Sequence, residues 1–475
     1  MKQVYKCFIK TISPVHIGCD EVYEPMGFVV DEQQKKLIAF DPIKFIGQLS
    51  KEDKQKFSTI CSKGTLESIL EIYKFLRRKT AGGNAVQLCD GFIKHYNKTL
   101  GLSTTNRKTL QQELGRFVIY RTSFLAADSR PYIPGTSLKG SLRTAYLNSL
   151  VKNRPGSTPS GKNAAKELEK KLLSYADIPT DPFRLVKVSD FMPVGAVQTR
   201  IFYAVNIKKG SGVTARGPFQ IVETILPGQI FSGTIVVEQP LAGAPIDKPI
   251  QLNALLSGCT GFYSSEYARE KEELKTAGTS ALQEPLGENA IPIRLGRHSG
   301  AESITIAGHR SIKIMGKRGE KPRTLDHATT LWLAGDESKP RSAAGCVPFG
   351  WAALCESLTE HEEDFTDKEQ LWLQAEANSS GTTAPGHSAV ENVAGPSIKP
   401  PEPETWENAI LLYAPNTGTV SARIDNKNAT AKTIDVVPVP LLETLKNRKK
   451  KKTVTATVIV EHIGGREYRL LEIKT

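Results

Sequence analysis

Glycines and cations gather at the start of a helix that the sequence predicts near residue 135. Residues 133–143 have the sequence Ile-Pro-Gly-Thr-Ser-Leu-Lys-Gly-Ser-Leu-Arg, and apolar residues then recur at helical spacing. Glycine lets a backbone approach a ligand closely, and the free N–H groups of a helix N-terminus attract anions. Lys139 and Arg143 lie four residues apart on one face, where the helix dipole disfavours cations unless an anion is bound. This stretch could therefore hold a phosphate.

Two other interpretations of this run must be weighed. A nucleotide-binding P-loop requires Lys and then Ser or Thr after its last glycine, but Ser141 and Leu142 follow Gly140, so this interpretation fails. A loop and helix start with solvated basic side chains explains the same residues, and the sequence leaves that alternative open.

A second loop repeats the combination of glycine and cations. Residues 293–300 have the sequence Ile-Arg-Leu-Gly-Arg-His-Ser-Gly, which places Arg294, Gly296, Arg297 and His298 together. The same physical argument applies, because glycines free the backbone and the neighbouring cations attract an anion.

Composition indicates what kind of anion to expect. The chain has 475 residues, 63 Lys plus Arg and a net charge of +13, which favours nucleic acid as a partner. The seven cysteines are odd in number and form no Cys-x-x-Cys pair, which is typical of a reducing cytoplasm and disfavours a zinc knuckle. No apolar run approaches the roughly 18 residues of a membrane span. We expect a cytoplasmic protein without a membrane contact.

The first half of the chain predicts an α+β unit. The pattern predicts a strand over Val4–Ser13, a hairpin of strands over residues 27–30 and 37–40, and a helix that begins at Asp41 and Pro42. Further expected elements are a helix over residues 66–76, a helical insertion over 80–115 and a strand over 116–121. We expect the helices on one face of an antiparallel sheet.

The second half predicts more strands. A hairpin is expected from residues 219–224 and 230–238 around Leu226–Gln229, and a helical region over 249–277. After these elements we expect a Ser/Gly/Pro-rich linker, strands near 409–413 and 453–460, and a basic run over 446–452 between these two strands. Earlier in the chain, residues 151–165 are expected to form a basic loop.

Three features together resemble a known family. They are Pro14–Gly18 after the first strand, the run 133–143, and Leu295–Gly300. The chain resembles the RAMP superfamily of CRISPR-associated RNA-binding proteins and, within it, the fifth Csm subunit of type III-A effector complexes. The sequence Pro-Phe-Gly-Trp at 348–351 is also similar to that subunit's pattern.

The resemblance implies an α+β fold with two ferredoxin-like (RRM-like) RAMP domains. These would be residues 1–180, with a helical insertion, and residues 181–360. An acidic and then Ser/Gly/Pro-rich linker, 361–405, and a β-rich basic appendix, 406–475, would follow. The implied function is a non-catalytic RNA-binding subunit that caps the 3′ end of the guide RNA and supports its maturation and complex assembly in antiviral defence. The implied partners are guide RNA, other RAMP subunits and a recruited host nuclease.

The RNA contacts implied by the resemblance lie in the two glycine loops. They are Gly135, Thr136, Ser137, Lys139, Gly140, Arg143, Arg294, Gly296, Arg297 and His298. A subunit that holds many guide sequences should contact phosphates and sugars, and leave base edges to Watson–Crick pairing.

The alternative is a stand-alone endoribonuclease for guide precursors. His16 could move a proton near neutral pH, as a histidine does in some stand-alone relatives, but its place between Val15 and Ile17 favours a structural role. Asp31 resembles the aspartate with which type III backbone subunits cut target RNA, but residues 31–34 indicate a hairpin turn. The sequence predicts no metal site and no cofactor, because no His, Asp or Glu cluster has metal-ligand spacing.

Overall fold

The computed structural model describes residues 2–153, 159, 161, 163–215, 217–279, 290–315, 319–356, 404–414, 419–424, 427–431, 454–464 and 467–474. The chain forms two compact units, residues 1–382 and 383–475. The expected linker falls almost wholly on residues outside this description, as does the basic run 446–452 and much of the expected loop 151–165.

The first sheet of unit 1 is built around the N-terminal strand. β1 (Lys2–Thr11) lies between β11 (Ile230–Glu238) and β17 (Trp351–Cys355), and all pairs in this sheet are antiparallel. Outside them lie β7 (Val186–Val188), β8 (Met192–Val194) and β12 (Ile291–Arg294). The expected first strand is confirmed, and its alternation buries Cys7 and Ile9.

The second sheet of unit 1 has nine strands. Its main order is β2 (Gly18–Val22), β6 (Ile119–Thr122), β10 (Gln220–Ile225), β9 (Thr199–Lys208), β5 (Asn84–Leu88), β4 (Lys36–Ala39) and β3 (Phe28–Asp31). β15 (Thr330–Gly335) pairs with β9 and with β16 (Val347–Pro348). The pairs β6–β10 and β5–β9 are parallel, so this sheet is mixed, not antiparallel as expected.

One sequence expectation about pairing is corrected. β10 and β11 do not form a hairpin, because β10 pairs with β9 and β6 while β11 pairs with β1 in the other sheet. A local Pro-Gly turn reverses the chain but does not choose the partner strand. Strands from both sides of residue 180 enter both sheets, and the expected division into domains at this residue stays a prediction.

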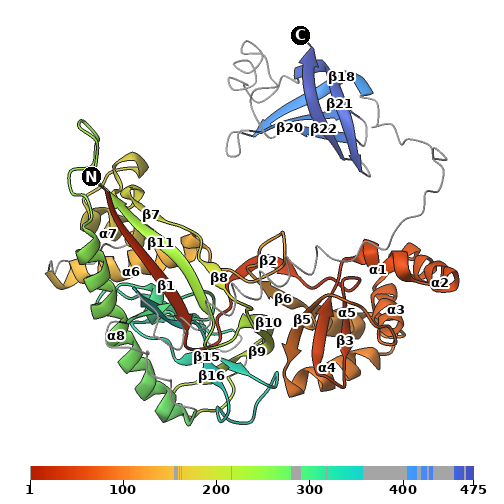
Figure 1. Cartoon of the computed structure of the whole chain (residues 1–475), viewed down its shortest axis with the longest axis horizontal. Coiled ribbons are helices and arrows are strands. Elements are labelled where there is room, and N and C mark those ends of the chain that lie inside the picture. Colours follow the sequence, from red (N-terminus) through yellow and green to blue (C-terminus); the bar gives the residue numbers. More distant parts are fainter. Residues whose placement is uncertain are drawn as a thin grey trace, which may run out of the picture. The chain divides into compact units, whose positions relative to one another are not determined.

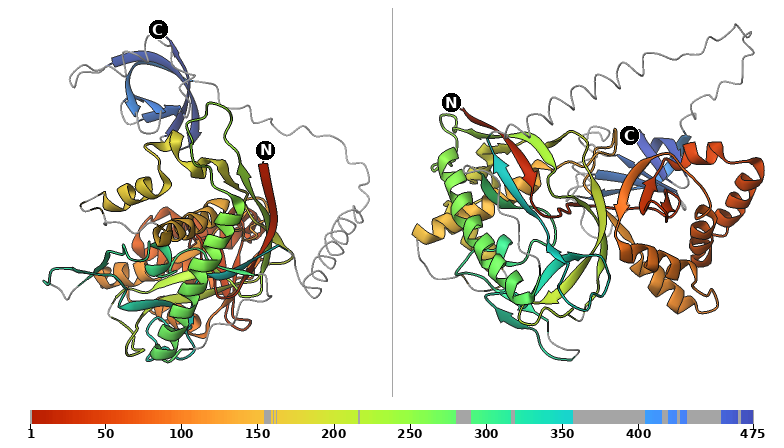
Figure 2. Two further views of the ribbon diagram at one scale, coloured as in Figure 1. Left: turned by 90° about the vertical axis from the view of Figure 1, so that its left-hand side faces the viewer. Right: turned by 60° about the horizontal axis from the view of Figure 1, so that its bottom comes forward.

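The helices of unit 1 form two groups (Figure 1). The first group is α1 (Pro42–Gln48), α2 (Lys51–Ser62), α3 (Leu66–Leu76), α4 (Asp90–Leu100) and α5 (Arg107–Arg116). α4 and most of α5 lie in the helical insertion expected over 80–115, and α3 is the helix expected over 66–76. These helices surround the end of the second sheet that carries β3, β4 and β5 (Figure 2, right). Asp41 caps α1 and Pro42 is its first residue, as predicted.

The second group covers the first sheet. It contains α6 (Gly135–Asn153), α7 (Ala164–Leu173) and α8 (Leu252–Ala277), and α6 packs on α8. The Tyr263 hydroxyl of α8 donates a 3.2 Å hydrogen bond to the Ser141 carbonyl of α6. One continuous apolar core links both sheets with these helices. The mixed helix and sheet class is therefore confirmed, while the count of ferredoxin-like domains stays a prediction.

Unit 2 is a closed sheet of five strands. The order is β18 (Glu404–Ala414), β19 (Thr419–Ile424), β20 (Lys427–Ala431), β22 (Glu467–Lys474) and β21 (Val454–Gly464). Trp406 and Tyr468 meet in its own small core at a ring distance of 4.8 Å. The strands expected near 409–413 and 453–460 correspond to β18 and β21. Of all helices in the described part of the chain, none is long and apolar enough to cross a membrane.

Candidate nucleic-acid interface

The early loop and the late glycine loop lie side by side. The Arg297 N–H donates to the His16 carbonyl at 2.8 Å. Gly350, in the Pro-Phe-Gly-Trp run, joins both loops, because its N–H donates to Pro14 at 2.8 Å and its carbonyl accepts from Leu295 at 2.8 Å. Three segments that are far apart in the sequence thus form one surface.

The start of α6 joins the same surface. The Ser123 N–H donates to Ile17 at 2.7 Å, and the Tyr132 N–H donates to Ser123 at 3.2 Å, immediately before α6. From the other side, the Ser141 hydroxyl donates to the Arg294 carbonyl. We call residues 13–18, 132–141 and 295–300 the loop surface. Its exposed residues are Gly18, Thr136, Gly140 and Arg297, whereas residues 13–17 are buried.

The glycines of the loop surface approach protein backbone. Gly296 has φ +76°, and a Cβ at this position would lie 2.3 Å from the His16 oxygen. A Cβ on Gly135 would lie 2.4 Å from the Val188 oxygen. Both positions therefore require glycine for packing. A Cβ on Gly140 would meet nothing within 4 Å, so this glycine is open to solvent.

The anion expected at the start of α6 is supplied by the protein. The Asp190 carboxylate accepts from the Gly135 N–H at 2.8 Å and so caps the helix. Arg143 is paired with Glu169 and with Asp181, each at 2.9 Å, and its guanidinium lies 5.0 Å from the Phe183 ring centre. The structure therefore corrects the interpretation of Arg143 as a phosphate ligand, because two carboxylates already neutralise it.

Lys139 is also bound within the protein. Its ammonium donates to the Val186 carbonyl at 2.8 Å, which ties α6 to β7. Burial and the nearby charge of Lys187 lower the pKa of Lys139. Beside it, Thr136 and Gly140 are exposed and Ser137 is half-buried, so the outer side of the helix start is accessible.

Arg294 does not belong to the loop surface. Its side chain is buried, with the residue only 3% exposed, and both terminal nitrogens bind Glu270 of α8. Its guanidinium lies 4.6 Å from the Trp351 ring centre. The prediction that Arg294 contacts RNA is corrected, because a buried and paired guanidinium cannot reach a ligand.

Arg297 and His298 have different surroundings. Arg297 is exposed, and its side chain lies against Gly18. The His298 ring lies between Trp332, at 4.8 Å, and Phe349, at 5.2 Å. Burial, with nearby His16 and Arg297, lowers the pKa of His298 to about 4, so this ring is neutral near pH 7.

A hollow of about 840 Å³ opens beside the late glycine loop. Besides Arg297 and His298, its lining combines one further cation with aromatic side chains: Arg116, Tyr120, Phe219 and Trp332. Arg116 pairs with Glu113 at 2.6 Å, so Arg297 is the cation of this lining without an ion pair among the described residues. Cations for phosphates and ring faces for bases are the two requirements of single-strand binding. These four residues come from α5, β6, β15 and the segment before β10, so sequence spacing gave no signal that they meet.

The two catalytic candidates have structural roles. His16 is 1% exposed, and its Nδ1 lies 2.7 Å from the Glu223 carbonyl oxygen. Burial lowers the pKa of His16 to about 4. Asp31 ends β3, and its Oδ1 accepts from the N–H groups of Gln33 and Gln34 at 3.0 and 2.9 Å. The predicted hairpin turn at Asp31 is confirmed.

Metal chemistry has no visible site in the described part of the molecule. No group of three or more His, Cys, Asp or Glu side chains in residues 2–356 and 404–474, as far as these are described, is placed to hold a metal ion. The loop surface and its hollow instead present cations, hydroxyls and rings.

Comparisons with known proteins show which sequences resemble this chain. Two curated relatives are each called CRISPR system Cms protein Csm5. The one from Methanocaldococcus jannaschii is 28% identical over 196 residues, which are 39% of this chain and 41% of that protein. The one from Enterococcus italicus is 21% identical over 221 residues, which are 44% of this chain and 54% of that protein. The matches thus span about half the length of these relatives.

One solved structure shares the fold. A chain in a cryo-EM structure of a Csm–crRNA–target RNA ternary complex of a type III-A CRISPR-Cas system has a TM-score of 0.50 and 18% identity, and the match covers 74% of this chain and 100% of that one. The crystal structure of T. onnurineus Csm5 has a TM-score of 0.43 and 16% identity, over 73% of this chain and 99% of that one. The sequence profile described as the RAMP superfamily matches residues 8–275, more than half of the chain. The chain belongs to the RAMP superfamily.

Proposed function

We propose that this chain is a non-catalytic RNA-binding subunit of a type III-A CRISPR effector complex. It caps the 3′ end of the guide RNA and supports guide maturation and complex assembly. Its partners are guide RNA, the other RAMP subunits and a recruited host nuclease that trims the guide. The names of the similar proteins support the complex, and the loop surface supports RNA as the ligand.

The observation that carries the proposal is the place of Arg297. It is exposed between the early loop and a hollow that is also lined by Tyr120, Phe219 and Trp332. A guide-holding protein must bind RNA of any sequence, and an arginine that binds phosphate beside rings that stack on bases does this. We propose that Thr136, Ser137, Gly140, Gly296, Arg297 and His298 contact the RNA, with Gly135 and Lys139 holding the helix start in place.

The endoribonuclease alternative loses support from the geometry. His16 is buried and hydrogen-bonded to backbone, and Asp31 is held in a turn. A general acid or base must come within hydrogen-bond reach of the reacting group, and a histidine that is 1% exposed does not.

Incubation of the purified chain with labelled repeat–spacer RNA tests the proposal. We expect binding whose strength falls with salt and intact RNA with or without divalent metal. Cleavage that His16→Ala abolishes while binding is kept would establish the nuclease instead. Binding that does not respond to salt would exclude phosphate contacts as its basis.

A further inference from the structure

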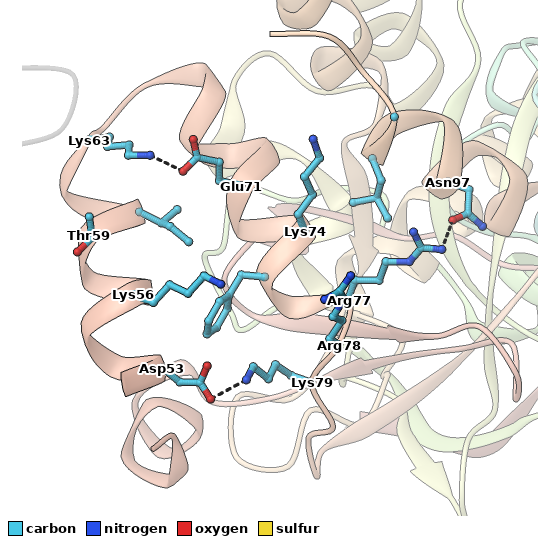
Figure 3. Close-up of a pocket in the computed structure, with 14 residues that line it drawn as sticks. Asp53, Lys56, Thr59, Lys63, Glu71, Lys74, Arg77, Arg78, Lys79 and Asn97 are labelled. Carbon is cyan, nitrogen blue, oxygen red and sulfur yellow. Dashed lines mark hydrogen bonds and ion pairs between the residues drawn. The ribbon is translucent and has the colours of Figure 1, made fainter. Parts of the chain in front are cut away.

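A large hollow lies among α2, α3 and α4. It has a volume of about 1270 Å³ and is lined by residues of α2, α3 and α4 and by the segments that follow α2, α3 and α4 (Figure 3). Its floor is apolar and contains Ile60, Phe75 and Leu100. The proposed function makes no use of this hollow.

Cations dominate the walls of the hollow. Six lining residues are basic and two are acidic: Lys56, Lys63, Lys74, Arg77, Arg78 and Lys79 against Asp53 and Glu71. Like charges gathered in this way repel one another unless an anion lies between them. The excess of cations therefore indicates an anionic occupant.

Some of these cations are satisfied within the protein. Lys63 pairs with Glu71 at 2.5 Å, and Lys79 pairs with Asp53 at 2.6 Å. Arg77 pairs with Glu32 at 2.8 Å and also donates to Asn97 at 2.6 Å. These side chains hold the walls in position and have little charge left for a ligand.

Three cations remain available. Lys56 of α2, Lys74 of α3 and Arg78, just after α3, are exposed. None of the three makes an ion pair with the residues that the structure describes, and Figure 3 shows them around the same hollow as the paired cations.

The helices that carry the three cations are firmly packed. The Phe57 and Phe75 rings of α2 and α3 lie 5.2 Å apart. Ser50 caps α2, and Thr65 and Ser68 form a capping box at the start of α3. The cations are therefore presented by a preformed surface, which lowers the cost of ordering it on binding.

Helix α4 lines both this hollow and a second one. It contributes Asn97 to the large hollow and Lys94 and Lys98 to another hollow of about 360 Å³. That second hollow is also lined by Arg116 and Phe219, which line the hollow beside the late glycine loop. Lys98 and Arg116 pair with Glu113 at 2.9 and 2.6 Å, which leaves Lys94 and Lys339 as the cations of the second hollow without an ion pair among the described residues.

We propose that these hollows form one track for the phosphate backbone of single-stranded RNA, which ends at Lys56, Lys74 and Arg78. The extended shape favours a linear polyanion over a compact acidic protein surface. The large hollow offers phosphate contacts without base stacking, because its one aromatic ring, Phe75, is buried. This inference rests on the proposed function, since it extends the RNA that the loop surface binds.

Length-dependent RNA binding tests the track. The full chain and the triple variant K56A/K74A/R78A are titrated with labelled oligouridines of about 6 and about 24 nucleotides, since single-strand sites span roughly 4–16 nucleotides per module. We expect the variant to bind the long RNA about tenfold more weakly at physiological salt. Its slope of log affinity against log salt should be smaller by about 2, since each phosphate contact with a single strand contributes about 0.7. The short RNA should bind both proteins alike.

A matched control removes the same charge elsewhere. K166A/K171A/K275A changes three exposed lysines on α7 and α8, which lie on the opposite side of unit 1 from α2 and α3 in Figure 1. It should bind the long RNA like the wild type. The charge-conserving variant K56R/K74R/R78K should also keep the length dependence, and circular dichroism and thermal unfolding confirm that each variant folds.

The outcomes separate the two proposals. If the wild type binds neither RNA, the proposed function and the track both fail. If the wild type binds both RNAs and K56A/K74A/R78A is unchanged, or loses no more than the control variant, only the track fails. If that variant keeps its RNA binding but no longer co-purifies with a subunit of the complex, the hollow binds an acidic protein surface instead.

Discussion

The N–H of Arg297 lies 2.8 Å from the carbonyl oxygen of His16, and this hydrogen bond fixes the late glycine loop on the loop that follows β1. It has two consequences. The His16 side chain is turned into the core, where its ring serves packing, while the Arg297 side chain is exposed beside the hollow. This hydrogen bond thus joins a buried histidine with a structural role to an exposed arginine that can bind a ligand.

Gly296→Ala should destabilise the protein. Its φ of +76° is strained for alanine, and the new Cβ would lie 2.3 Å from the His16 oxygen. We expect a loss of about 1–3 kcal/mol in the free energy of unfolding, measured by denaturant titration. Gly140→Ala is the matched control, because its Cβ meets open space in a helix and should stabilise by up to about 1 kcal/mol. Equal effects of the two changes would contradict the assigned packing of the late loop.

Arg294→Ala should act on stability and not on RNA contacts. It leaves the carboxylate of Glu270 buried without its partner, which costs about 3–5 kcal/mol in comparable buried pairs. The double variant R294M/E270L should recover most of this loss, because it removes both charges together. A stable Arg294→Ala protein with a reduced salt slope of RNA binding would restore Arg294 as an RNA ligand.

Arg297→Ala should weaken RNA binding without a loss of stability. Its side chain is exposed, so the salt slope should fall by about 0.7 for one lost phosphate contact, and to the same extent for unrelated RNA sequences. Lys171→Ala on α7 removes one exposed charge outside the loop surface and serves as the control. A loss confined to one RNA sequence would point to base recognition and contradict the phosphate contact.

The stability of the chain should fall as pH falls from about 6.5 towards 4. Burial lowers the pKa of His16 and of His298 to about 4, whereas both titrate near 6.5 in the unfolded chain. Below 6.5 the unfolded state therefore binds more protons, and each group contributes a slope of up to about 1.4 kcal/mol per pH unit. Carboxylates titrate in the same window, so the test compares wild type with His16→Gln, whose unfolding free energy should depend less steeply on pH. Equal slopes for the two proteins would show that His16 is protonated in the fold.

Local signals in the sequence predicted local structure well. Asp41 and Pro42 start α1, Asp31 closes a hairpin, and the run after Pro134 forms α6, because caps, turns and helical periodicity act over a few residues. Contacts between residues far apart in the sequence could not be predicted from it. Nothing near Arg294 points to Glu270, nothing near Gly135 points to Asp190, and the Pro-Gly turn after β10 does not show that β11 enters another sheet.

The same contrast between local signals and long-range contacts applies to the candidate site. The two glycine loops were found from composition, and the structure places them together on one surface. Their hollow was missed because Arg116, Tyr120, Phe219 and Trp332 come from separate elements that only the sheet order brings together.

Purification of the tagged chain from its native cells, with sequencing of the bound RNA and identification of co-purifying proteins, is the most direct test of the proposed function. We expect repeat–spacer guide RNAs together with other RAMP subunits, and guides with untrimmed or missing 3′ ends when the gene is deleted. Recovery of the chain with no repeat-derived RNA and no RAMP subunit would contradict the proposed function.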